Sequence, residues 1–286
     1  MTQYTDHYGP EGLRTRGTVV VVPGRGEGRA AYARFGRRLA ADAYRVRVVD
    51  APRIDAGDLS GSLARFGAGL AAAVEDAAAE DGVVRPVVLV GADSGAAAVA
   101  ALLGREESSV VPFPEAVVLA GLPGRGADDG APVDNGVAGR AGRAGRAGRA
   151  GRAGRAGRAG GSSWDDELDV RTFCPAHRGV LTDDAGTQRG SLGIAVPDAL
   201  LDAAHHGTIA VPTLILVGDA DPLADRDALA RTAKSLSRSR LAVVRDAHHD
   251  VLNDLQHRSV AAEVVTFLET VRNALVPVVA VESSTW

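Results

Sequence analysis

The stretch that decides the fold of this chain runs Pro86-Val87-Val88-Leu89-Val90-Gly91-Ala92-Asp93-Ser94-Gly95-Ala96-Ala97-Ala98-Val99-Ala100-Ala101. The apolar run before Gly91 suits a parallel strand that is buried on both faces, and the alanine-rich run after Gly95 has a high helix propensity. Gly91 and Gly95 also frame Asp93, and two such glycines let the backbone turn tightly enough to lift the central side chain above a sheet. We therefore expect a buried strand, a sharp turn that presents an aspartate, and a helix.

Strand and helix patterns alternate on both sides of this stretch. We expect further strands at 18–22, 45–50, 116–120, 211–218 and 240–245, and further helices at 32–40, 59–79, 225–235 and 260–275. Strands that alternate with helices are joined by right-handed crossovers and form a parallel sheet with helices on its two faces. The sequence thus predicts the α/β class, with a mostly parallel central sheet.

The regular pattern fails between residues 124 and 207. Residues 138–160 are seven copies of Ala-Gly-Arg followed by Ala-Gly, and repelling arginines among glycines cannot bury apolar surface. We expect that tract to be disordered. A chain of 286 residues with 45% hydrophobic content is long enough for one α/β domain with an insertion. We predict a core made of 1–123 and 208–286, and a small cap made of 124–207 with a short helix at 198–204.

The net charge and the cysteine content limit the classes of molecule that this chain is expected to bind and the compartment in which it is expected to work. Seven arginines lie in the repeat, so the formal net charge falls from −4 for the whole chain to −11 for the rest. A surface that acidic is a poor partner for nucleic acid. No apolar run approaches the roughly 18 residues of a membrane span, the N-terminal residues lack the apolar segment of a secretory signal, and Cys174 is the sole cysteine. These features predict a cytoplasmic protein that does not bind nucleic acid.

Three motifs follow expected strands in a fixed order around Asp93. They are Pro23-Gly24-Arg25-Gly26-Glu27, Gly218-Asp219-Ala220-Asp221-Pro222 and His249-Asp250-Val251-Leu252-Asn253-Asp254. Together with the glycine-framed turn they resemble the α/β-hydrolase superfamily, in which a nucleophile, an acid and a histidine follow one another along the chain. The resemblance is closest to the monoacylglycerol lipase and lysophospholipase branch, whose corresponding motifs are His-Gly-x-x-Glu, Gly-x-x-Asp-Pro and His-Glu-x-x-Asn-Glu.

The resemblance implies a role for each matching position. His249 is implied to be the general base and Asp221 to orient its imidazole, while the backbone N–H groups of Arg25 and Ser94 are implied to form an oxyanion hole. The chemistry is sound independently of the family, because a histidine exchanges protons near neutral pH, a buried carboxylate fixes its tautomer, and two N–H donors stabilise a developing anion. No cofactor is implied.

Asp93 is the main departure from this branch, which has a serine there, and Pro23 replaces a histidine. Aspartate in this position resembles the haloalkane dehalogenase and epoxide hydrolase branches, where the carboxylate attacks carbon and a His-activated water hydrolyses the resulting ester. Epoxide hydrolases donate protons from tyrosines of the cap, whereas all four tyrosines here precede it. Dehalogenases usually place a tryptophan after the nucleophile, and here the residue is Ser94.

Several alternatives stay open at this point. Ser94 is an alternative nucleophile in a frame shifted by one residue, which would make the protein an esterase or lysophospholipase. The chain can also be a binding protein on a hydrolase scaffold that performs no reaction. We expect no metal site, because Cys174-x-x-His177 offers two ligands and His205-His206 adds no recognised spacing. The glycines at 24, 26 and 28 do not have the spacing of a dinucleotide fingerprint.

Overall fold

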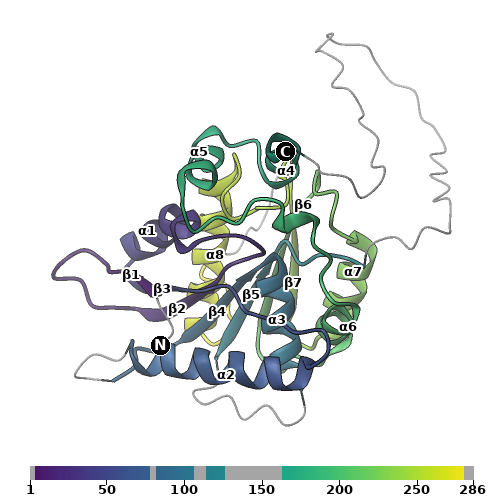
Figure 1. Ribbon diagram of the computed structural model, residues 1–286. Coiled ribbons are helices and arrows are strands. Elements are labelled where there is room, and N and C mark those ends of the chain that lie inside the picture. The colour runs from purple at the N-terminus through teal and green to yellow at the C-terminus, as the bar shows by residue number, and fades with distance from the viewer. Residues whose placement is uncertain (1–3, 78–81, 106–113, 126–162, 280–286) are drawn as a thin grey trace, which may run out of the picture.

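The computed structural model describes residues 4–77, 82–105, 114–125 and 163–279, so the Ala-Gly-Arg repeat and its predicted disorder lie outside the described residues. A seven-stranded sheet with the order β1-β3-β2-β4-β5-β6-β7 forms the centre of the molecule (Figure 1). All neighbouring strands are parallel except β1, which is antiparallel to β3. The strands are β1 (Tyr4–His7), β2 (Gly17–Val22), β3 (Tyr44–Val49), β4 (Val87–Ala92), β5 (Ala116–Ala120), β6 (Thr213–Gly218) and β7 (Ser239–Val244).

Helices cover both faces of the sheet, which confirms the predicted class (Figure 1). Alternate residues of the central strands, such as Val20 and Val21, belong to two separate apolar clusters, because successive side chains of a strand point to opposite faces. One cluster packs against α2 (Leu59–Glu75), α3 (Asp93–Leu103), α6 (Asp198–His206) and α7 (Arg226–Ser235). The other packs against α1 (Ala33–Ala41) and α8 (His257–Arg272).

The predicted insertion contributes helices at one end of the sheet (Figure 1). They are α4 (Trp164–Arg171) and α5 (Pro175–Asp183), and α4 begins with a capping box in which the side chains of Ser163 and Asp166 bond each other's backbone N–H groups. The helix expected at 198–204 is α6, which extends to His206 and packs on α3 through its apolar face. None of the helices in the described part of the chain is long and apolar enough to cross a membrane.

Strand β1 is an element that the sequence pattern did not predict. It has four residues and its side chains are polar or partly exposed, so it carries no apolar run. Its place at the edge of the sheet is held by Asp6, whose two carboxylate oxygens accept hydrogen bonds from Arg47 Nε at 2.7 Å and Nη2 at 2.6 Å. The Arg47 side chain is 1% exposed and also donates to the carbonyl of Ala73. A buried charge pair therefore fixes this edge strand.

We expect the substitution Asp6→Asn to lower the free energy of unfolding by about 2–4 kcal/mol at pH 7, because it leaves a buried guanidinium unpaired. Burial raises the pKa of Asp6, but hydrogen bonds and the charge of Arg47 hold it below the usual range. This stabilisation is present above the unfolded pKa of about 4, and it is lost as the pH falls through the lower folded value. The difference between wild type and variant should shrink below about pH 4 in urea unfolding.

A matched control is Glu263→Gln, which removes the exposed ion pair with Arg240. Exposed pairs contribute about 0–1 kcal/mol. Equal effects of the two substitutions would contradict the role assigned to the Asp6 pair.

Candidate functional site

Asp93 lies at the turn between β4 and α3, with φ +47°, a left-handed conformation that is rare for a residue other than glycine. The two framing glycines are needed because the turn is crowded. A Cβ at Gly91 would lie 2.6 Å from the Cα of Ala96, and a Cβ at Gly95 would lie 2.4 Å from the carbonyl oxygen of Pro23. The packing of α3 against β2 and β4 thus holds the Asp93 side chain at the end of the sheet.

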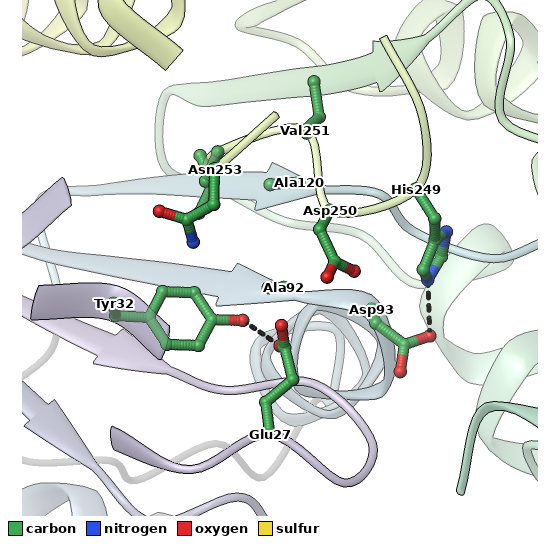
Figure 2. A pocket seen from close by; sticks show the side chains of 10 residues that line it. Glu27, Tyr32, Ala92, Asp93, Ala120, His249, Asp250, Val251 and Asn253 are labelled. Atoms are coloured by element: carbon green, nitrogen blue, oxygen red, sulfur yellow. Dashed lines mark hydrogen bonds and ion pairs between the residues drawn. The ribbon is translucent and has the colours of Figure 1, made fainter. Parts of the chain in front are cut away.

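His249 and Asp221 come to Asp93 from the loops that follow β7 and β6. His249 Nδ1 lies 2.9 Å from Asp221 Oδ2. Its Nε2 lies 3.1 Å from Asp93 Oδ1, the contact that Figure 2 shows. The second contact is an ion pair without hydrogen-bond alignment. Gly121, with φ +58°, lets the backbone after β5 pass close to His249, because a Cβ there would lie 2.6 Å from the His249 carbonyl oxygen. The three residues predicted as a catalytic set are in contact, in the order Asp93, His249, Asp221.

Arg25 covers the other side of Asp93, from the loop after β2. Its backbone N–H donates to Asp93 Oδ2 at 2.8 Å, while Nε lies 2.9 Å from Oδ2 and Nη2 lies 2.8 Å from Oδ1. The remaining terminal nitrogen, Nη1, donates to the carbonyls of Leu192 and Ile194 in the insertion. The sequence predicted a role for the backbone of Arg25 only, so its guanidinium is an addition to the site.

Ser94 is half-buried in the first turn of α3. Among the hydrogen bonds of the described residues, its side chain makes none, and the ion-pair partner of His249 Nε2 is Asp93. The first N–H groups of a helix have no partner within the helix. The backbone N–H of Ser94 is therefore able to donate a hydrogen bond to a ligand, which is the role that the sequence predicts for it.

Charges at this site stabilise one another. Burial raises the pKa of Asp93, but His249 and Arg25 overcome that effect and hold it well below its usual range. Burial lowers the pKa of His249, and the charges of Asp221 and Asp93 overcome it and raise the pKa to about 10. Each carboxylate contributes, so neutralising either one lowers the pKa of the imidazole. At neutral pH the site holds an ionised Asp93 between two cations.

Helix α4 connects the loops that carry these residues. Arg171 Nη2 donates to the carbonyl of Arg25 at 2.7 Å, and the backbone N–H groups of His249 and Asp250 donate to the carbonyls of Val170 and Arg171 at 3.2 and 2.8 Å. Arg171 is fully buried and paired with Glu167 at 2.9 Å. Neither Arg171 nor Glu167 was predicted from the sequence. Their spacing of four on a short helix is a signal for an ion pair, but it does not show that the pair faces a site.

A small cavity of about 10 Å³ lies beside Asp93 and His249, and a water molecule needs roughly this much space. Figure 2 shows the side chains around it. The lining residues are Glu27, Tyr32, Ala92, Asp93, Ala120, His249, Asp250, Val251, Leu252 and Asn253. An ionised carboxylate and a histidine beside such a cavity are suited to nucleophilic attack followed by hydrolysis.

Comparisons with known proteins identify the family and the fold of this chain. A family model described as alpha/beta hydrolase family matches residues 19–264. Similar solved structures include a monoacylglycerol lipase from Paleococcus ferrophilus (TM-score 0.64, 16% identity, 95% of this chain and 99% of that chain covered). They also include the putative non-heme bromoperoxidase BpoC from Mycobacterium tuberculosis H37Rv (TM-score 0.60, 17% identity, 95% of this chain and 96% of that chain covered). The enol-lactonase from Burkholderia xenovorans LB400 is a third example (TM-score 0.57, 17% identity, 94% of this chain and 96% of that chain covered). No curated protein matches the chain in sequence.

Proposed function

The chain belongs to the alpha/beta hydrolase family and is on that ground a hydrolase, and from this premise we propose that Asp93 is its nucleophile toward a small, fairly apolar substrate. The observation that carries the proposal is the contact of Asp93 Oδ1 with His249 Nε2 at 3.1 Å, on an imidazole whose Nδ1 is 2.9 Å from Asp221. The family's serine position is here an aspartate, and the histidine and acid of the triad are retained around it.

In the first step, Asp93 Oδ1 attacks a saturated carbon of the substrate, such as the halogen-bearing carbon of a haloalkane. A carbon–oxygen bond forms, and the leaving group departs with the electron pair of the bond that breaks. The product is an ester between the substrate and Asp93. Because Arg25 Nη2 lies 2.8 Å from Oδ1, its guanidinium has to release this oxygen before the attack.

Before the second step, the His249 imidazolium gives up a proton to the departing group or to solvent. The neutral imidazole then takes a proton from the water that attacks Cγ of the Asp93 ester. Esterification has removed the negative charge of Asp93, so one of the two carboxylates that favour the imidazolium is gone. The negative charge of the tetrahedral intermediate develops on Oδ2, which lies 2.8 Å from the backbone N–H of Arg25. The N–H of Ser94 is the second donor in this proposal. Collapse of the intermediate breaks the bond between Cγ and the oxygen of the substrate alcohol, and His249 returns its proton to the departing alkoxide. The carboxyl group of Asp93 then passes its proton to His249, which restores the carboxylate and the imidazolium.

The test compares wild type, Asp93→Ala and Ser94→Ala on a panel of haloalkanes and activated esters with short to medium chains. We expect Asp93→Ala to lower turnover by at least about 10³-fold, because the nucleophile is lost, and Ser94→Ala to change it by less than about tenfold. The preferred leaving group identifies the bond that is cleaved.

The opposite pattern, with loss in Ser94→Ala alone, would overturn the proposal and make the protein a serine esterase. Equal turnover in all three proteins would also overturn it, since the Asp93 carboxylate would then take no part in the reaction.

A further inference from the structure

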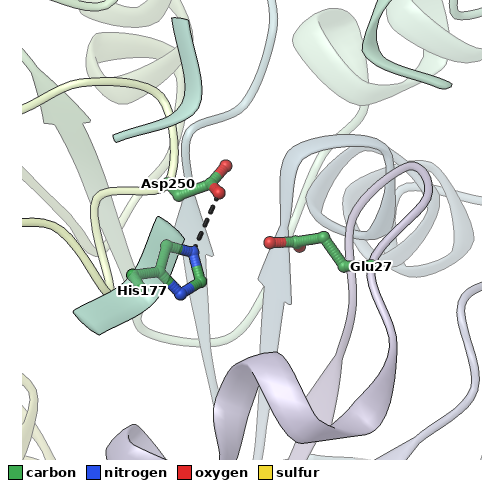
Figure 3. A group of neighbouring side chains, drawn as sticks. All are labelled: Glu27, His177 and Asp250. Carbon is green, nitrogen blue, oxygen red and sulfur yellow. Dashed lines mark hydrogen bonds and ion pairs between the residues drawn. The ribbon is translucent and has the colours of Figure 1, made fainter. Parts of the chain in front are cut away.

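A second group of polar side chains lies next to the proposed catalytic residues and takes no part in the steps above. Glu27 comes from the loop after β2, His177 from α5, and Asp250 from the loop after β7 (Figure 3). One potential ligand atom from each residue lies within 4.8 Å of the others. His177 Nε2 and Asp250 Oδ2 are 3.0 Å apart. Their positions in the sequence give no metal-binding spacing, so only the fold brings them together.

One carboxylate oxygen in this group has no hydrogen-bond partner. Glu27 Oε2 accepts from the N–H of Gly24 at 3.0 Å and from the hydroxyl of Tyr32, whereas Oε1 accepts from nothing among the described residues. Glu27 is 7% exposed, and its carboxylate points toward His177 and Asp250 in Figure 3. A buried hydrogen-bond acceptor without a partner lowers the stability of the folded protein. The space between the Glu27 carboxylate and the side chains of His177 and Asp250 is therefore where a positively charged ligand would bind.

The surroundings carry an excess of negative charge. Arg171 is the guanidinium that faces this group, with Nη1 3.6 Å from Asp250 Oδ1, and the same side chain is paired with Glu167. Among the described residues, the three carboxylates of Glu27, Glu167 and Asp250 face the Arg171 guanidinium, and the charge of His249 also acts on Asp250.

We propose that Glu27, His177 and Asp250 bind one divalent transition-metal cation, with Zn²⁺ as its representative. One imidazole and two carboxylates match the ligand preferences of Zn²⁺, while Mg²⁺ prefers oxygen ligands alone. Metal–ligand bonds of about 2.0–2.2 Å place neighbouring ligand atoms about 3.3 Å apart in a tetrahedron, close to the 3.0 Å between His177 and Asp250. Glu27 completes the set by a small rotation of its carboxylate, and water supplies the fourth ligand.

Binding requires His177 Nε2 to be free of its proton, which moves to Nδ1, so the ion replaces the hydrogen bond to Asp250. Such an ion would tie α5 to two loops of the core. One of these loops carries Arg25 and the other carries His249, next to Asp250 in the sequence. We expect its role to be structural, since it joins an insertion helix to both sides of the site.

The experiment is calorimetric titration of the full chain, freed of metal by a chelator, with ZnCl₂. We expect one ion per chain and a higher Tm with Zn²⁺, because binding to the folded state stabilises it. Glu27→Gln and His177→Ala should each weaken binding by about 100-fold, since each removes a ligand. His206→Ala is the matched control, because His206 is an exposed histidine at the end of α6, and it should bind like wild type.

Wild type that binds no Zn²⁺, or variants that bind as tightly as wild type, would overturn the proposal. Glu27→Gln keeps the size and shape of the side chain, so it decides the question if His177→Ala fails to fold. The titration needs no substrate, and we expect Asp93→Ala to bind Zn²⁺ normally, so the outcome is independent of the proposed reaction.

Discussion

The substitution His249→Gln is expected to stop the reaction after its first step and to leave part of the substrate bound to Asp93. Arg25 keeps the Asp93 carboxylate ionised in this variant, so attack on carbon is still possible. Glutamine cannot take a proton from water, so the ester persists and turnover falls by about 10³–10⁴-fold. Mass spectrometry of the intact protein, after reaction with the best haloalkane of the panel, should show a mass increase of one alkyl group.

Two further variants make this result specific. His249→Gln combined with Asp93→Asn should show no mass increase, because the nucleophile is absent. His248→Gln changes the neighbouring histidine, which contacts Asp254 and not Asp93 or Asp221, and it should keep turnover within about tenfold of wild type. An inactive His249→Gln protein without an adduct would contradict a covalent step at Asp93.

The substitution Gly95→Ala is expected to lower the free energy of unfolding by about 3 kcal/mol or more. The added Cβ would lie 2.4 Å from the carbonyl oxygen of Pro23 and 2.6 Å from that of Val22, and both atoms belong to the backbone. Neither can move without separating α3 from the end of β2. Thermal unfolding followed by circular dichroism should show a Tm lower by about 5–10 °C.

Gly179→Ala is the matched control, because Gly179 lies inside α5 and a Cβ there would have no neighbour within 4 Å. Alanine favours a helix by about 1 kcal/mol over glycine, so this variant should be as stable as wild type or more stable. A Gly95→Ala protein with the stability of Gly179→Ala would show that the turn at Asp93 is not tightly packed.

The parts of the structure that were predictable have local signatures. The apolar runs at β2, β4, β5 and β6 gave their positions and the α/β class, and the glycines around Asp93 gave the turn. Asp93, Asp221 and His249 could be placed together because their order along the chain, each after an expected strand, resembles that of the α/β-hydrolase superfamily. Their proximity is observed, and their catalytic roles stay predictions.

The remaining contacts are polar, and the partners lie far apart in the sequence. Arg171 and Arg25 are 146 positions apart, and nothing in the pattern around either one points to the other. The guanidinium of Arg25 is a similar case, because a motif that assigns a backbone N–H says nothing about the side chain. The three residues of the proposed metal site, Glu27, His177 and Asp250, were likewise not expected from spacing. The periodicity of apolar residues indicates which positions are buried. It does not indicate which buried charged residues form pairs with one another.

The hydrogen bonds from α4 to both sides of the site also bear on how the protein is made. On a ribosome the β2 loop emerges early and α4 later, and the segment that carries His249 follows both. The carbonyl groups of Val170 and Arg171 are therefore made before the backbone N–H groups of His249 and Asp250 that donate to them in the folded protein. We therefore expect a nascent chain that ends before β7 to contain a partly ordered sheet but no assembled centre, so that the centre forms only late in synthesis.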